Sequence, residues 1–169
     1  MCIRDRLSAC AAAGFERLAD AIEKSVARAG ADAVHRLRAG SLAYIEFALR
    51  HRALFQLMFR RDRLDPEHAE LKVAGKRTGD LLRRVIDELI VARELPAEER
   101  GRRILLAWSL VHGYATLVLE EQCAGLFGLS AAQFRPASRM GDELLRLLET
   151  GLVAPAGPDN PPTRSPSSR

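Results

Sequence analysis

Cysteine is scarce in this 169-residue sequence, and its copies are widely separated. The three cysteines are Cys2, Cys10 and Cys123. They form no C-x-x-C pair and no spacing that is typical of a metal site. Their odd number indicates a reducing compartment, so we expect a cytoplasmic protein. His35, His51 and His68 are scattered among charged residues, and we predict no metal ion and no cofactor.

Long apolar runs are also missing. The most apolar stretch falls just short of the roughly 18 residues that indicate a transmembrane helix. Charged residues at Arg4, Asp5 and Arg6 occupy the place where a signal peptide would have its apolar segment. We therefore predict no membrane partner.

Aromatic residues make up only 5% of the chain, although 47% of its residues are hydrophobic. A composition dominated by Ala, Leu and Arg favours helices and carries little strand signal. The net charge of +4 is spread along the predicted helices, so it does not by itself indicate nucleic-acid binding. The sequence predicts an all-α fold, an antiparallel helical bundle of about six helices.

Apolar periodicity and capping residues set the predicted boundaries. Asp32 is a suitable cap for the second helix, and Asp65-Pro66 is a strong start for the fourth. The predicted helices are 7–29, 33–50, 54–60, 65–93, 97 to about 124, and 138–150.

The two ends of the chain differ from its middle. Residues 1–6 resemble a translated sequencing adapter, and we interpret them as a non-native leader on a fragment. Residues 154–169 have hardly an apolar side chain and are predicted to be disordered. The domain itself is predicted to span residues 7–153.

The stretch Ile104–Leu119 organises the rest of the chain. It is apolar on nearly all sides when it is placed on a helix, so it must be buried on nearly all sides. We expect its own domain to cover one side and a second copy to cover the other. With the last helix it would form half of a four-helix bundle between subunits, or else the two helices pack only on each other. The predicted dimer residues are Leu106, Leu110, Gly113, Leu117, Leu144, Leu147, Leu148 and Gly151.

Aromatic side chains gather at two further places. Phe55, Met58 and Phe59, with Tyr44 and Phe47, either line an apolar cavity or form ordinary core packing, because composition does not separate the two. His112 lies one turn beyond Trp108. It is either a polar contact in a small-molecule pocket or a core histidine bonded to a neighbour. The predicted ligand-binding residues are Tyr44, Phe47, Phe55, Met58, Phe59, Trp108, Val111 and His112.

Three blocks in order resemble one class of TetR-type regulator C-terminal domains. Ala107–Gly113, with its Trp, His and Gly, is similar to the Trp-His-Gly signature of that class. Ala13–Leu18 looks like the start of the helix that follows the DNA-binding head, and His51–Phe59 is similar to a P-x-L-F-x-L-M-F segment, although its Pro is absent here. The resemblance covers residues 8–152.

The resemblance implies the regulatory half of a transcriptional repressor, with a pocket for a small apolar or amphipathic effector and a homodimer interface. No helix-turn-helix precedes Leu7, so contact with DNA is expected only through an N-terminal head that this chain lacks. The alternative is a standalone helical dimer or small-molecule carrier. An enzyme would need convergent titratable groups. No acid or nucleophile lies at a fixed spacing from His112, and we predict no catalytic residue.

Overall fold

The computed structural model describes residues 2–120, 142, 143, 145 and 146, and this described part is helical with no strand. Its helices are α1 (Ile3–Arg28), α2 (Ala33–Arg50), α3 (Arg52–Met58), α4 (Ala69–Ala92) and α5 (Arg100–Leu119), with a 3-10 turn, η1 (Ala97–Glu99), before α5. The predicted all-α class is confirmed. The last predicted helix falls largely outside the described residues.

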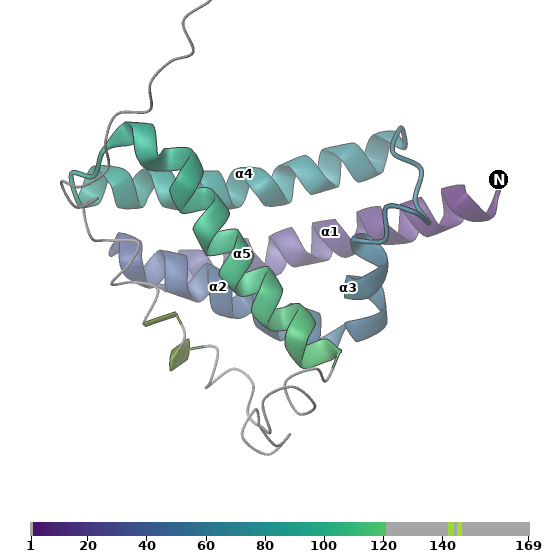
Figure 1. Cartoon of the computed structure of the whole chain (residues 1–169), viewed down its shortest axis with the longest axis horizontal. Coiled ribbons are helices and arrows are strands. Elements are labelled where there is room, and N and C mark those ends of the chain that lie inside the picture. Colours follow the sequence, from purple (N-terminus) through teal and green to yellow (C-terminus); the bar gives the residue numbers. More distant parts are fainter. Residues whose placement is uncertain (1, 121–141, 144, 147–169) are drawn as a thin grey trace, which may run out of the picture.

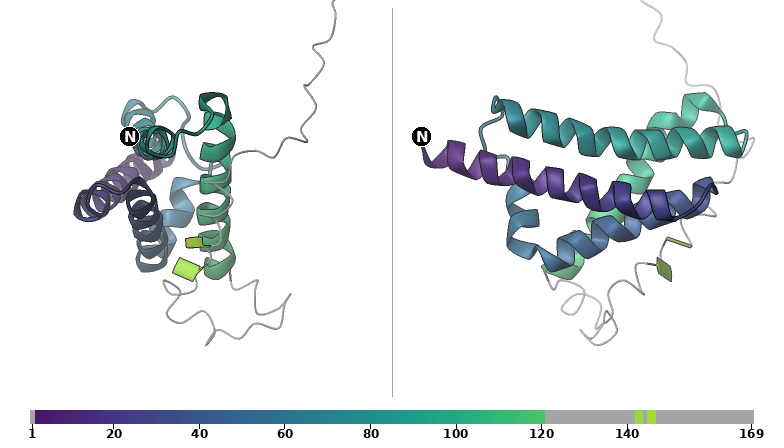
Figure 2. Two further views of the ribbon diagram at one scale, coloured as in Figure 1. Left: turned by 90° about the vertical axis from the view of Figure 1, so that its left-hand side faces the viewer. Right: turned by 180° about the vertical axis from the view of Figure 1, so that it is seen from behind.

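The three long helices α1, α2 and α4 all pack against one another, and α5 crosses α2 and α4 on the side away from α1 (Figures 1 and 2). α1 and α4 lie side by side and run in the same direction, with α2 antiparallel to both (Figures 1 and 2). α5 crosses obliquely in front of them and packs on α2 and α4 (Figure 1). The core between these helices contains Leu18, Ile45, Ile86 and Leu89, which are all but inaccessible to solvent.

Polar contacts fix α4 against α1. Arg77 of α4 donates to Glu16, to Asp20 at 2.8 Å and to Glu23 at 2.6 Å. A single guanidinium of α4 therefore binds three carboxylates on successive turns of α1. The Thr78 hydroxyl also donates to the Phe15 carbonyl oxygen at 3.2 Å.

The boundaries of α2 were predicted correctly, and those of α1 and α4 were not. Asp32 caps α2 as expected, with its carboxylate accepting from the His35 amide at 2.8 Å. α1 begins at Ile3, four residues before the predicted start, because Cys2 and Asp5 form a capping box around its first turn.

α4 begins at Ala69 and not at Pro66. The Asp65 carboxylate accepts from the Glu67 amide at 2.9 Å, which closes a turn, and His68 then caps the helix. The Ser8 hydroxyl accepts from the Asp65 amide at 2.8 Å and ties this turn to α1.

The short third helix is shifted by two residues. It spans Arg52–Met58 where residues 54–60 were predicted, because His51 interrupts α2 with a φ of −122° and the chain resumes its helix directly afterwards. Arg52 then donates to the carbonyl oxygen of Leu119 at the end of α5. α3 is therefore connected to the far end of the crossing helix.

Two helical residues from the region of the last predicted helix contact the described domain. The Arg38 guanidinium forms two 2.5 Å hydrogen bonds with the Asp142 carboxylate, and Leu145 is buried in the core. No helix of the described ranges is long and apolar enough to cross a membrane.

Candidate functional site: an apolar cavity between α4 and α5

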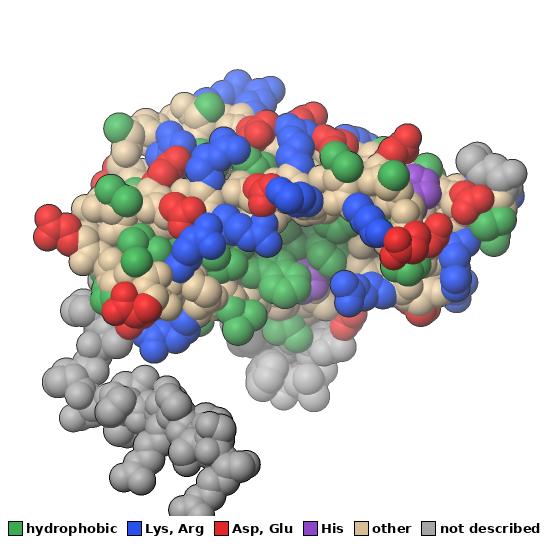
Figure 3. Space-filling view, turned by 90° about the horizontal axis from the view of Figure 1, so that it is seen from above, with side chains coloured by type: hydrophobic (Ala, Val, Ile, Leu, Met, Phe, Trp, Pro, Cys, Tyr) green, Lys and Arg blue, Asp and Glu red, His purple; other side chains and the backbone are tan. Residues whose placement is uncertain are grey.

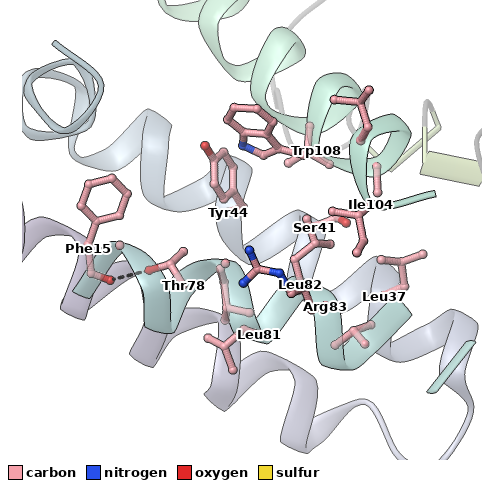
Figure 4. Close-up of a pocket in the computed structure, with 18 of the residues that line it drawn as sticks. Phe15, Leu37, Ser41, Tyr44, Thr78, Leu81, Leu82, Arg83, Ile104 and Trp108 are labelled. Atoms are coloured by element: carbon pink, nitrogen blue, oxygen red, sulfur yellow. Dashed lines mark hydrogen bonds between the residues drawn. The ribbon is translucent and has the colours of Figure 1, made fainter. Parts of the chain in front are cut away.

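A cavity of about 370 Å³ lies between α4 and α5, and α1 and α2 contribute to its wall. This volume is in the range of about 300–1,000 Å³ that small-molecule pockets occupy. Figure 4 shows Phe15, Tyr44, Ile104 and Trp108 around it. The arrangement follows from the oblique crossing, because α5 touches α2 and α4 without lying flat in the groove between them.

α4 supplies the largest share of the lining. Two glycines, Gly75 and Gly79, stand one turn apart on the side of α4 that faces the cavity. A side chain at Gly75 would meet no atom within 4 Å, so the missing side chain leaves open space. The lining residues that the sequence analysis did not identify are Phe15, Ile22, Leu37, Gly40, Ser41, Gly75, Thr78, Gly79, Leu81, Leu82, Arg83, Val85, Gly101, Ile104, Leu105 and Ala107.

Four of the eight predicted ligand-binding residues line the cavity. They are Tyr44, Phe59, Trp108 and Val111. Trp108 keeps 45% of its surface exposed and stands at the opening, whereas Tyr44 is buried deep inside.

The other four predicted residues, Phe47, Phe55, Met58 and His112, do not line it. Phe47 packs on His51 with ring centres 4.8 Å apart. Met58 is buried against Gly14, since a Cβ at Gly14 would lie 2.8 Å from its sulfur. Phe47, Phe55 and Met58 are buried in the core, and His112 is half-buried beside the cavity.

A hydrogen bond connects Tyr44, which lines the cavity, with His112, which does not. The Tyr44 hydroxyl lies 2.8 Å from Nδ1 of His112. The imidazole is stacked on Trp108 at 5.4 Å between ring centres, with Phe59 at 4.4 Å and Phe55 at 5.7 Å. His112 is thus held from several sides by aromatic rings and positions the Trp108 indole.

Both partners of this pair are neutral at pH 7. Burial raises the pKa of the Tyr44 hydroxyl well above its usual value, and a hydrogen bond with Trp108 offsets this only in part. Burial lowers the pKa of His112. The neutral phenol donates to Nδ1 when the imidazole proton is on Nε2. A neutral pair suits an apolar cavity, since no charge is left without water.

The outer side of α5 is open in the described structure. Leu106 and Leu117 expose 42% and 37% of their surface, Leu110 is half-buried, and a Cβ at Gly113 would meet nothing within 4 Å. The described residues therefore cover the stretch Ile104–Leu119 on one side only. The remaining predicted dimer residues, Leu144, Leu147, Leu148 and Gly151, lie outside the described residues.

Within residues 2–120 and the four described residues near 144, no group of three or more His, Cys, Asp or Glu side chains could hold a metal ion. The two groups buried together near the cavity, Tyr44 and His112, bond to each other. The described site is an apolar cavity, and the described residues around it include no nucleophile with an adjacent base.

The fold and cavity define an all-α domain built around an apolar pocket. Residues 37–140, more than half of the chain, match the family described as "Tetracyclin repressor-like, C-terminal domain". The chain belongs to this family, and the resemblance to TetR-type C-terminal domains is confirmed.

A solved structure of a protein with unknown function from Rhodococcus sp. RHA1 is similar to this chain, with a TM-score of 0.69 and 29% sequence identity. The match covers 87% of this chain and 69% of that one. A comparison with curated proteins found no match.

Proposed function

We propose that this domain is the effector-binding and dimerisation half of a TetR-type transcriptional repressor. The observation that carries the proposal is the 370 Å³ cavity beside Trp108, whose lining is mostly apolar with a few hydroxyls. A small apolar or amphipathic molecule would bind there. Binding would favour one arrangement of the two subunits and so change the spacing of two DNA-reading heads.

The open side of α5 supports a homodimer. The described residues leave the apolar side chains that repeat along this face exposed, and contiguous exposed apolar surface is typical of interaction sites. Gly113 has free space around it, which permits the close backbone approach of a second α5. A two-fold contact between α5 helices would cover Leu106, Leu110 and Leu117 together.

A binding screen tests the effector part. Trp108 is the single tryptophan of the chain and stands at the cavity opening. A ligand in the cavity should therefore change its fluorescence and raise the melting temperature of the domain. A broad set of apolar and amphipathic molecules that produces neither effect would contradict the proposal.

A distance measurement tests the regulatory part against a simple carrier. Cys10 is exposed on α1, the helix that would follow a DNA-binding head. Spin labels on Cys10 in a Cys2→Ser, Cys123→Ser variant report the separation of the two α1 helices in a dimer. A regulator predicts that a bound effector shifts this distance. A carrier predicts the same distance with and without ligand.

A further inference from the structure

Among the described residues that line the cavity, one carries a charge. Arg83 of α4 is the cation, and neither Asp nor Glu is present in this described lining. Figure 4 shows its guanidinium among the lining side chains. In the space-filling view, a hollow of hydrophobic side chains is bordered by Lys and Arg side chains (Figure 3).

The position of Arg83 depends on Gly79. Nη1 of Arg83 lies 3.3 Å from where a Cβ on Gly79 would be, so the guanidinium lies back across the glycine. Nη1 also donates to Asp80 at 2.6 Å, and Lys76 donates to the other oxygen of the same carboxylate at 2.6 Å. Lys76, Asp80 and Arg83 together carry a net charge of +1, from two cations and one anion.

Part of the guanidinium is available to a ligand. Nε and Nη2 of Arg83 form no hydrogen bond with any residue that the structure describes. Arg83 exposes 47% of its side chain, so these donors are hydrated before binding. Ser41 lines the same cavity, is 8% exposed and has no hydrogen-bond partner within the described ranges.

We propose that the cavity selects a monocarboxylate with an apolar tail, whose head group is bound by Arg83 and whose tail extends toward Trp108 and Phe15. This inference rests on the proposed effector-binding function and names the chemical class of the effector. A guanidinium and a carboxylate match in shape and charge, and two parallel hydrogen bonds can form between them. The rest of the described wall is mostly apolar and would hold the tail.

The cavity volume guides the choice of a test ligand. At about 30 Å³ for each water-sized group, 370 Å³ holds roughly a dozen non-hydrogen atoms. Decanoate has that size. 1-Decanol and decylamine have the same tail with a neutral and a positive head, so the three molecules differ mainly in charge.

The test is a titration of Trp108 fluorescence with decanoate, 1-decanol and decylamine. Wild-type protein should bind decanoate about tenfold more tightly than 1-decanol, and decylamine least tightly, since a partly exposed charged pair has a modest effect. Arg83→Gln should remove this preference and leave 1-decanol unchanged. Arg84→Gln is the matched control, because Arg84 is exposed on the same helix and does not line the cavity.

Each result of the titration supports or overturns the assignment of Arg83 as the residue that binds the carboxylate. A tenfold loss of decanoate affinity in Arg83→Gln, recovered in part by Arg83→Lys, supports the assignment. Equal binding of decanoate and 1-decanol by the wild-type protein overturns the assignment of the head group and leaves an effector cavity in place. This ranking in the wild-type protein decides the question even where Arg83→Gln does not fold. Absence of any fluorescence response to all three probes overturns the carboxylate assignment, and the broader screen then decides whether the effector cavity fails as well.

Discussion

Filling the cavity from α4 should stabilise the domain while it blocks the ligand. Gly75 lies in the interior of α4 and lines the cavity, and a Cβ at this position would have no atom within 4 Å. Gly75→Ala should raise the free energy of unfolding by about 1 kcal/mol, because glycine in a helix interior costs about that much relative to alanine. The small methyl group should leave ligand binding nearly intact.

Gly75→Leu adds the burial of an apolar side chain. Full burial of a leucine contributes about 1.5–3 kcal/mol, and we count about half of this because the cavity is open on one side. The total gain is then about 2 kcal/mol, which corresponds to a rise of roughly 4–8 °C in melting temperature for a chain of this length. Affinity for any ligand in the cavity should fall at least tenfold.

The assay is thermal unfolding at fixed protein concentration, combined with titration of Trp108 fluorescence. Concentration is held fixed because dimerisation alters apparent stability. Arg84→Leu serves as the control, since it adds a leucine to α4 away from the cavity. A Gly75→Leu protein that is less stable than wild type, or that binds its ligand as tightly, would refute the reasoning that this space is open and is the binding site.

Three further predictions concern the wall and outer face of α5. Leu106→Glu should give a monomer by light scattering, because it places a charge in the proposed interface. The control Val91→Glu, at a site 79% exposed on α4, should leave the dimer intact. A Leu106→Glu protein that remains dimeric would place the interface elsewhere. Tyr44→Phe should lower the free energy of unfolding by about 1 kcal/mol in a denaturant titration, because Nδ1 of His112 loses its partner; an unchanged value would mean that the bond contributes nothing. Burial lowers the pKa of His112 in the folded protein, so as pH falls the imidazole is protonated first in the unfolded chain. The contribution of His112 to stability is therefore complete above the ordinary histidine pKa of about 6.5. Below that pH the free energy of unfolding falls, by at most about 1.4 kcal/mol per pH unit. The fall should stop once the folded protein is protonated too, and His112→Gln should lack this component in denaturant titrations across pH 4.5–7.5 (approximate limits set by the His pKa).

The helices were largely predictable because their signals are local. Apolar periodicity located the long elements, and the Asp32 cap fixed the start of α2. The start of α4 was wrong because Asp65 bonds to the amide of Glu67 in a turn, an arrangement that uses the same residues as a helix cap. The Cys2 cap of α1 was missed because cysteine is an unusual capping residue.

From the sequence, only the large apolar and aromatic side chains of the cavity lining could be predicted. Tyr44, Phe59, Trp108 and Val111 were identified as lining residues, whereas the contribution of α4 was missed. Gly75 and Gly79 had a visible cost to the helix, but a missing side chain leaves no apolar pattern to follow. In the sequence, Arg83 could not be distinguished from a solvent-facing arginine. It lines the cavity because of the angle at which α5 crosses α4, and packing of the whole domain sets that angle.

The central claim is that α5 separates a ligand cavity on its inner side from a second copy of the chain on its outer side. Native mass spectrometry with a ligand from the screen measures both at once. We expect a dimer of 2 × 18.7 = 37.4 kDa that gains up to one ligand mass per chain. An 18.7 kDa species that gains no ligand, under conditions where the domain is folded, would contradict the account.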